Sequence, residues 1–337
     1  MKHFKLWKVK TSAIVVGMIA VSACNKTIEQ SQQQSLITTE AHSITSRTTT
    51  FPYSQTYTSF DLTQLNLFAW KGKKVMILSR NSNLNEMTMR KWLRAMDATY
   101  GYYRLCTGRE PTPYAPTYID NHTTIADVPS TCGAGCGYLG FTGIEMQNDY
   151  FDIMYYAINN NNEYDQEDFY EFGRNFWFYG DKLAYKENDP VATGYAVFMR
   201  FLAMDAAGVK GAPFGSWSFS TFESKVKNLI NSYLADPSLN WANTLGIGQG
   251  VPNSELGATD LFASFCFRLR QDFGGDNFVR KVWKKAGLRP NAITTQDAVD
   301  NFFLSSCAAA NKNLTAVFQS WRWPLSANAI SQASTYP

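Results

Sequence analysis

Three neighbouring side chains in the segment 169–177 could do chemistry together, because their spacing suits one face of a helix. Tyr170 and Arg174 are four residues apart, and Glu171 flanks them. Residues four apart lie one above the other on an α-helix. A carboxylate can act as a base or nucleophile, a phenol can donate a proton, and a guanidinium binds carboxylate, phosphate or sulfate as a fixed fork. The simpler interpretation is that Glu171 and Arg174, at i and i+3, form an ion pair.

A second carboxylate, Glu167, precedes Glu171 by four residues. Two carboxylates one helical turn apart can reach the separation of about 5–5.5 Å that retaining glycosidases use. More commonly, two such acids simply lie on a solvated face of the helix. The sequence offers little support for a Ser/His/Asp or Cys/His mechanism, because its three His are His3, His42 and an isolated His122.

The N-terminus reads as a targeting segment. A basic stretch with four Lys precedes a short apolar run over 13–23, which ends in Val21-Ser22-Ala23-Cys24. That ending resembles a bacterial lipobox, in which the Cys becomes the lipidated first residue after cleavage. We therefore predict a signal peptide over 1–23 and lipidation at Cys24. The protein would be lipid-anchored in the bacterial cell envelope, at the outer membrane or cell surface, with the membrane as a partner. The alternative is an ordinary secretory signal cleaved near Ala23.

The region after the signal peptide predicts a flexible tether over 24–55, because it is rich in Ser, Thr and Gln and poor in aromatic residues. Removing the four Lys of the signal lowers the basic residues from 31 to 27, against 28 acidic ones. The mature chain is then close to neutral, and no basic patch argues for a nucleic-acid partner. We predict one domain over 56–330, with lobes of about 56–188 and 189–330.

Five Cys remain after Cys24, so an exported chain would keep at least one free thiol. We expect Cys106 to pair with Cys132 or Cys136, and Cys266 could pair with Cys307. The alternative for Cys266 is a buried free thiol, since it lies in an apolar run. Connectivity does not follow from the sequence.

The coarse pattern of elements predicts an α+β fold with a helical C-terminal lobe. Strands are expected at 74–79 and 123–128, and a glycine-punctuated strand pair at 137–146. Glycine inside a strand often marks a close backbone approach. The segment 151–158 suits a strand or a short helix. Apolar residues at helical spacing predict helices at 85–100, 165–185, 191–206, 222–234, 254–272, 277–286, 295–309 and 314–321.

The segment 170–177 resembles the metal-binding helix of zincins, and most closely that of the M60-like peptidases of gluzincin type. That helix reads H-E-x-x-H, often H-E-x-G-H-N, with two His that bind Zn²⁺ and a Glu that activates water. Glu171, Gly173 and Asn175 match this pattern. Tyr170 and Arg174 stand where the family has its two His.

Two further segments resemble the same family. Gly194-Tyr195-Ala196 matches its Gly-Phe/Tyr-Ala signature, and Thr193 then stands where the family has its third ligand, a Glu. The end of the chain, 318–326, is also similar, so the likeness covers roughly 137–326. It implies a zincin-like fold: a strand-containing lobe, the motif helix, then a helical lobe.

The same comparison implies that the metal is lost, because no inferred ligand position holds a zinc ligand and Arg cannot coordinate a cation. We expect no cofactor. One hypothesis is a non-proteolytic protein that binds a glycan or glycoprotein in the former substrate cleft. The alternative is a metal-independent hydrolase, glycosidase-like, that uses Glu171 with Tyr170 and Arg174.

Aromatic residues make up 15% of the chain and offer candidates for contacts with sugar rings. The zincin resemblance places Phe141, Trp177 and Tyr195 among the substrate-binding residues, with Tyr155 and Tyr156 near them. The alternative interpretation is a large aromatic core.

Overall fold

The computed structural model describes residues 52–337. The predicted signal peptide, Cys24 and nearly all of the predicted tether lie outside these residues. The first strand begins at Tyr53, so it includes the last residues of the segment predicted as a tether. Within the described residues, no helix is both long and apolar enough to cross a membrane.

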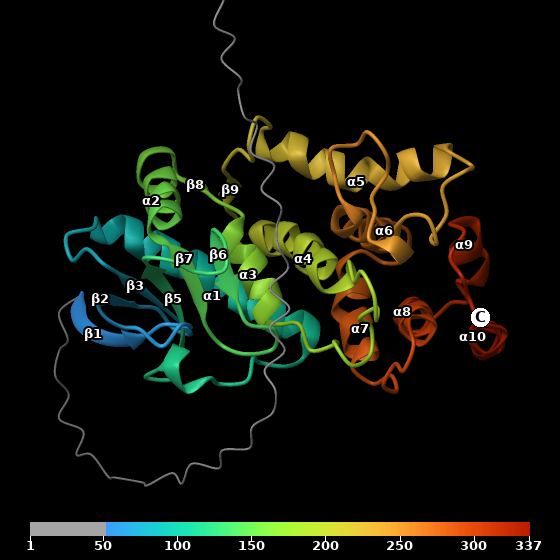
Figure 1. The fold of residues 1–337 in the computed structure, drawn as a ribbon, viewed down its shortest axis with the longest axis horizontal. Coiled ribbons are helices and arrows are strands. Elements are labelled where there is room, and N and C mark those ends of the chain that lie inside the picture. Colours follow the sequence, from blue (N-terminus) through green and yellow to red (C-terminus); the bar gives the residue numbers. More distant parts are fainter. Residues whose placement is uncertain (1–51) are drawn as a thin grey trace, which may run out of the picture. The chain divides into compact units, whose positions relative to one another are not determined.

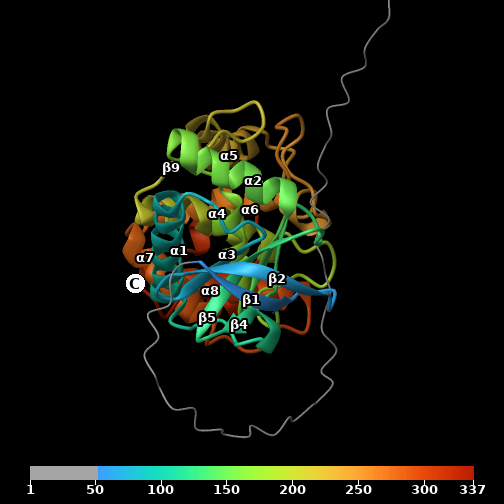
Figure 2. The same ribbon diagram turned by 90° about the vertical axis from the view of Figure 1, so that its left-hand side faces the viewer.

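A seven-stranded mixed sheet forms the N-terminal half, with the spatial order β1-β2-β3-β5-β7-β6 and with β4 paired to β5. β3, β5 and β7 are parallel to one another, and the remaining pairs are antiparallel. The strands are β1 (Tyr53–Thr58), β2 (Gln64–Lys71), β3 (Val75–Ser79), β4 (Tyr118–Ile119), β5 (His122–Val128), β6 (Gly135–Gly137) and β7 (Ile144–Gln147). Figure 2 shows the β1–β2 pair in front of the helices.

The antiparallel pair β6–β7 closes one end of the sheet, with Cys136 opposite Glu145. The prediction of a glycine-punctuated strand pair at 137–146 is confirmed for the pairing and for its second strand, β7, but its first strand is wrong in place, because β6 ends at Gly137 and 138–143 form an irregular connection. The strands predicted at 74–79 and 123–128 are confirmed as β3 and β5. The β1–β2 hairpin was not expected.

Helices α1 (Glu86–Thr107) and α3 (Glu167–Asn175) pack on one face of this sheet, and α2 (Asn148–Tyr156) follows β7. Asn85 caps α1 by accepting a hydrogen bond from the Thr88 backbone N–H, which satisfies one of the orphan donors of the first turn. Apolar side chains of α1, including Trp92 and Met96, are buried in the main core. A smaller core, centred on Tyr57, Met76 and Leu78, forms around β1, β2, β3 and β5.

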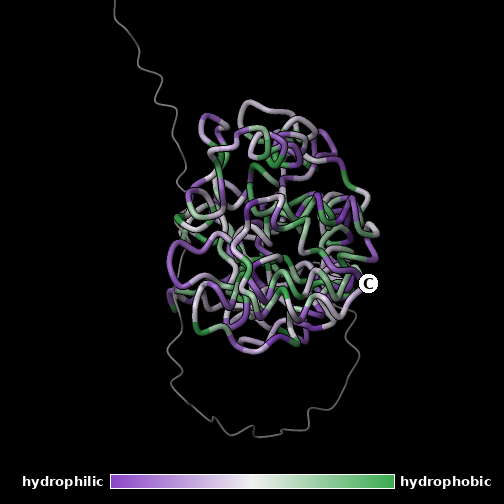
Figure 3. The backbone as a smooth tube through the Cα atoms, turned by 90° about the vertical axis from the view of Figure 1, so that its right-hand side faces the viewer, coloured by the Kyte–Doolittle hydropathy of each residue, from purple (hydrophilic) through white to green (hydrophobic). Residues whose placement is uncertain are grey.

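The C-terminal half is helical, as predicted. Helix α4 (Val191–Ala207) packs against α1, α3 and α6, so it joins the sheet layer to the rest (Figure 1). The remaining helices are α5 (Phe219–Ala235), α6 (Ala258–Asp272), α7 (Asp276–Ala286), α8 (Thr295–Ala310), α9 (Thr315–Ser320) and α10 (Ala327–Ala333). A short two-stranded sheet pairs β8 (Glu163–Tyr164) with β9 (Lys210–Gly211). Hydrophobic and hydrophilic stretches alternate along the backbone (Figure 3), and the buried apolar side chains of this half belong to the main core.

The helix predicted over 165–185 is wrong in its second half, because α3 ends at Asn175. Phe176, Trp177 and Tyr179 are all buried in the irregular segment that follows. A continued helix would turn these near-consecutive rings toward different sides, whereas the irregular backbone directs all three into one core. Packing therefore overrides the local periodicity. The ambiguous segment 151–158 is mainly helical, as α2 and the π-helical turn Ala157–Asn161.

The cysteine pairing predicted from the sequence is also wrong. Cys132 and Cys136 form a disulfide with a Cα–Cα distance of 5.6 Å, within the usual range for such bonds. Cys106, Cys266 and Cys307 are free and buried. Each lies in a different helix of the apolar core, so burial rather than cross-linking explains them, and the buried free thiol at Cys266 is confirmed.

Candidate functional site at the junction of α3 and β6

The three positions that the sequence comparison aligned with zinc ligands come together in space. Tyr170 and Arg174 lie on α3, and Thr193 lies in the first turn of α4. Nη1 of Arg174 donates a hydrogen bond of 3.2 Å to Oγ1 of Thr193. Burial raises the pKa of Tyr170 to about 12, and a hydrogen bond with Thr193 opposes this rise. The sequence thus predicted the convergence of the three residues, although it could not supply their contacts.

Glu171 is almost completely buried, with 4% of its surface exposed. Its Oε2 has no hydrogen-bond partner among the described residues. Burial raises its pKa to about 8, and the charge of Glu167 adds to the rise, whereas Arg174 and a hydrogen bond from the Gly137 backbone N–H oppose it. At neutral pH the side chain is therefore mainly a protonated carboxylic acid.

The ion pair expected between Glu171 and Arg174 is not formed. Within residues 52–337, Arg174 lies within 4 Å of no carboxylate oxygen. The charge of Arg174 still lowers the pKa of Glu171 against the effect of burial, so the two groups interact without direct contact.

Glu167 lies one turn before Glu171 and also faces β6. Burial raises its pKa to about 7, the charge of Asp165 raises it further, and Arg200 opposes the rise. The amide of Gln166 donates a 3.0 Å hydrogen bond to its Oε2. The simple interpretation of this pair as a solvated helix face is therefore wrong, because both acids are held in the packed junction between α3 and β6.

Two glycines of β6 lie directly over these two acids. A Cβ on Gly137 would stand 2.8 Å from the backbone oxygen of Glu171 and 2.9 Å from its Oε2. A Cβ on Gly135 would stand 3.3 Å from Cγ of Glu167. Residues two apart in a strand point the same way, and residues four apart on a helix share a face, so the two spacings match. This is the close backbone approach that the glycines predicted.

Asn175 fixes the chain that follows β6. Its Nδ2 donates hydrogen bonds to the backbone oxygens of Tyr138 (3.1 Å) and Gly143 (3.0 Å). The backbone N–H of Gly140 donates to the oxygen of Arg174 at 3.2 Å. The end of α3 and the segment 138–143 therefore hold each other in place. The sequence comparison matched Asn175 to the family pattern but gave it no role.

Helices α3 and α4 approach closely at two other matched positions. A Cβ on Gly173 would stand 2.8 Å from both Cα and Cβ of Ala196. Only glycine at this position lets the two backbones come so near. This crossing places Thr193, one turn earlier on α4, beside Arg174.

The predicted sugar-stacking residues are mostly buried. Trp177 is 3% exposed and Tyr195 is fully buried, and the two rings pack on each other and on Tyr179. Substrate contact through Trp177 or Tyr195 does not fit this burial, and the alternative of an aromatic core fits it. Tyr155 is buried as well, whereas Phe141 is partly exposed and Tyr156 is exposed.

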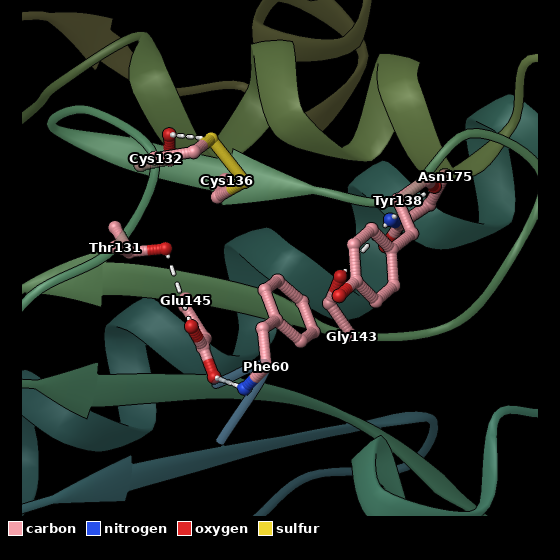
Figure 4. The surroundings of a disulfide bond; sticks show 9 residues. Phe60, Thr131, Cys132, Cys136, Tyr138, Gly143, Glu145 and Asn175 are labelled. Carbon is pink, nitrogen blue, oxygen red and sulfur yellow. Dashed lines mark hydrogen bonds between the residues drawn. A yellow bond between two sulfur atoms is a disulfide. The ribbon is translucent and has the colours of Figure 1, made fainter. Parts of the chain in front are cut away.

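Three other aromatic residues form a partly exposed group beside β6, which we call the aromatic shelf: Phe60, Tyr114 and Tyr138. The rings of Phe60 and Tyr138 stack with centroids 4.0 Å apart (Figure 4), and Tyr114 meets Tyr138 edge-on at 5.7 Å. The sequence analysis missed this group. Only the place of Tyr138, directly after Gly137, could have indicated it, because Phe60 and Tyr114 come from distant segments.

Glu145 of β7 holds Phe60 in the shelf. Its Oε1 accepts hydrogen bonds from the backbone N–H of Phe60 (2.6 Å) and from the hydroxyl of Tyr57 (3.1 Å), and Oε2 accepts one from Thr131 at 3.2 Å. Burial raises the pKa of Glu145 to about 7, against the effect of these bonds. The Cys132–Cys136 disulfide lies close by (Figure 4).

The residues at the junction do not fit a zinc ion. Tyr170, Arg174 and Thr193 supply no imidazole, thiolate or carboxylate, and a guanidinium cannot coordinate a cation. Across residues 52–337, no group of three or more His, Cys, Asp or Glu side chains could hold a metal. The ring nitrogens of His122 lie 2.6 Å from the oxygen of Asp120 and 3.2 Å from that of Gly72, at the start of β5.

Comparisons with known proteins agree with this fold. No family model and no curated protein matches the sequence. Among solved structures, a conserved protein of unknown function from Bacillus anthracis superposes with a TM-score of 0.53 at 12% identity, over 80% of this chain and 51% of that one. A metallopeptidase in complex with Tn antigen gives 0.51 at 14% identity, with the same coverage. The M60 catalytic domain of ZmpB from Clostridium perfringens, solved with two CBM51 domains, gives 0.50 at 12%, over 80% of this chain and 26% of that one.

The chain therefore has a metallopeptidase-like, zincin-like fold of α+β class, and its described residues lack the zinc ligands. It spans about half the length of the first two structures. At such low identity the likeness concerns the fold alone.

Proposed function

We propose that this protein binds a glycan or a glycoprotein on the surface formed by the aromatic shelf and β6, without cleaving it. The observation that carries the proposal is the shelf itself: aromatic rings that remain partly exposed beside β6. Partly exposed rings offer an apolar face together with a polar edge, which suits the C–H face of a sugar and its hydroxyl groups.

The edge of β6 supports binding over peptide cleavage. An edge strand normally offers unpaired backbone groups to an extended peptide. Here the N–H of Gly137 bonds to the carboxyl of Glu171, which occupies one donor of the edge. The acid that would activate water lies beneath the same strand.

One structural neighbour was solved in complex with Tn antigen, which supports a glycan epitope as a ligand for this fold. We further propose that the chain is exported and lipidated at Cys24. The tether would then hold the domain at the surface of the bacterial envelope, where it could meet glycoproteins.

Glycopeptide binding tests the proposal. A glycopeptide that carries the Tn antigen is titrated by calorimetry into the wild type and into Tyr138→Ala and Tyr138→Phe. We expect Tyr138→Ala to lose at least tenfold in affinity, whereas Tyr138→Phe, which keeps the ring, stays within threefold. Equal binding by the wild type and Tyr138→Ala would contradict the role of the shelf.

The hydrolase alternative makes a different prediction. If Glu171 were catalytic, Glu171→Gln would abolish release of sugar or peptide from the same glycopeptide while leaving its binding intact. We expect no turnover by the wild type. Release of product by the wild type, and its loss in Glu171→Gln, would favour the hydrolase.

A further inference from the structure

Helix α7 presents to solvent a face that carries only positive charge. Arg280, Lys281, Lys284 and Lys285 are all exposed. Their spacing of one and four residues places them on one side of the helix. The other side is buried in the main core, where α7 packs against α1 and α8 (Figure 1). We call these four residues the basic face of α7.

The basic face has no ion-pair partner within residues 52–337, because none of its four side chains lies within 4 Å of a carboxylate oxygen there. The acids at the two ends of this region have other partners. Asp276, the first residue of α7, pairs with Arg270 at 2.9 Å. Asp297 caps α8 by accepting hydrogen bonds from the backbone N–H groups of Ile293 (3.0 Å) and Thr294 (2.8 Å). The basic face therefore keeps its charge.

Helix stability explains only half of the basic face. Lys284 and Lys285 lie in the last turn of α7, where a cation interacts favourably with the negative end of the helix dipole. Arg280 and Lys281 lie before that turn. Each of them is four residues from another cation, a spacing at which like charges repel. These two charges weaken the helix slightly, so they favour an anionic partner outside the chain.

Two strongly exposed apolar side chains follow the basic face in the connection from α7 to α8. Leu288 is 77% exposed and Ile293 is 78% exposed, the highest values among the large apolar side chains of the described residues. The backbone N–H of Leu288 donates to the oxygen of Lys285 at 3.1 Å, so the helical turn continues and Leu288 extends the basic face. One exposed leucine is ordinary, but aliphatic side chains beside a row of cations are typical of helices that lie on a membrane surface.

We infer that the basic face of α7, together with Leu288 and Ile293, docks on the anionic surface of a lipid bilayer. The cations attract the lipid phosphates, and the two aliphatic side chains enter the boundary between headgroups and acyl chains. An acidic polysaccharide would match the charge but would leave Leu288 and Ile293 in water. The anchor proposed at Cys24 would bring the domain to such a surface. Docking through α7 does not depend on glycan binding by the aromatic shelf.

Sedimentation of the full-length protein with lipid vesicles tests the inference. One set of vesicles is pure phosphatidylcholine, and in the other set phosphatidylglycerol replaces about a third of it, to supply negative charge. We expect the combined variant Arg280→Gln, Lys281→Gln to bind the anionic vesicles roughly 30-fold more weakly than the wild type, because each cation near such a surface contributes about fivefold. The matched control Lys210→Gln, Lys225→Gln loses the same charge from β9 and α5 and should bind like the wild type. All the proteins keep residues 1–51, so that segment contributes equally to each affinity.

A second variant, Leu288→Ser with Ile293→Ser, tests the apolar part of the surface. We expect it to bind the anionic vesicles at least about tenfold more weakly than the wild type, because neither serine can enter the acyl boundary. Circular dichroism checks that every variant is folded. If both combined variants bound the anionic vesicles as the wild type does, α7 would not be the docking surface. If only the variant without the two cations lost affinity, the basic face would recognise anions in general, and the bilayer as its partner would be overturned.

Discussion

Replacement of Gly137 by alanine tests the packing of β6 on the carboxylates of α3. The new Cβ would stand 2.8 Å from the backbone oxygen of Glu171 and 2.9 Å from its Oε2, closer than real Cβ contacts come. One of these neighbours is helix backbone and the other is a buried acid. Neither can move away without shifting β6 or α3.

The structure supplies a graded series for this experiment. At Gly135 the closest atoms, at 2.8 and 2.9 Å, are Sδ and Cε of Met146, the flexible end of a side chain. At Gly133, which is exposed, the nearest atom lies 3.7 Å away, an ordinary contact. The three positions lie within one five-residue stretch: Gly133 and Gly135 are inside the disulfide loop, and Gly135 and Gly137 are in β6.

The expected magnitudes follow from two opposing effects. Overpacking costs about 1–3 kcal/mol, and replacing glycine in a strand by alanine returns about 0.5–1 kcal/mol. The difference of these two ranges is about 0–2.5 kcal/mol, and we expect Gly137→Ala to lose unfolding free energy in the upper half of it, because neither neighbour can move away easily. Gly135→Ala should lie near zero, because Met146 can move. Gly133→Ala should be neutral or gain up to about 1 kcal/mol.

Urea denaturation of the four proteins, followed by tryptophan fluorescence, measures the unfolding midpoints. The order Gly137→Ala, Gly135→Ala, Gly133→Ala from least to most stable would support the reasoning. If Gly137→Ala unfolded at the same urea concentration as Gly133→Ala, β6 would not press on Glu171, and the buried state of this acid would need another explanation.

Three further predictions concern the same region. The folded-state pKa of Glu171, about 8, exceeds its ordinary value of 4.5, so its contribution to stability is present below pH 4.5 and is lost as the pH rises through 8. In urea denaturation, Glu171→Gln should therefore lose less stability than the wild type when the pH is raised from 5 to 9. Parallel pH profiles of the two proteins would count against this. Zinc titration by calorimetry should show no saturable binding to the wild type. The combined variant Tyr170→His, Arg174→His, Thr193→Glu should bind one Zn²⁺, because the fold already brings the three positions together. A variant that binds no Zn²⁺ would show that the distances between the three side chains do not suit the ion. Trp177→Ala should cost about 3–5 kcal/mol as a core truncation, and a loss of binding without a loss of stability would return Trp177 to the ligand surface.

Local patterns predicted those parts of the fold that depend on neighbours in the chain. The apolar stripe of α1 predicts a buried helix face, and the apolar run of β3 predicts a buried strand. The glycines of β6 predict a close approach of the backbone to a neighbouring element. The same holds for Tyr170 and Arg174, whose shared helix face needs only a period of 3.6 residues.

Features that depend on distant segments could not be predicted in this way. The aromatic shelf needs the β1–β2 hairpin to deliver Phe60 to Tyr138, a contact between residues 78 positions apart. The end of α3 at Asn175 depends on the core that receives Trp177 and Tyr179, which includes Trp283 of α7. Even the burial of Glu171 could not be read from its helix, because the covering strand lies more than thirty residues earlier in the chain.

Packing and a hydrogen bond hold α3 and α4 together where they cross. In a metal site the ligands on two helices are held by the ion they share, so removal of the ligands should leave the helices free to separate. Here the contact between Gly173 and Ala196 brings the backbones together by packing, and the hydrogen bond from Arg174 to Thr193 joins two of the positions that resemble zinc-ligand positions. Burial raises the pKa of Glu171 to about 8 and that of Glu167 to about 7, so neither acid is fully ionised at neutral pH. The geometry of the site is thus maintained by packing and hydrogen bonds.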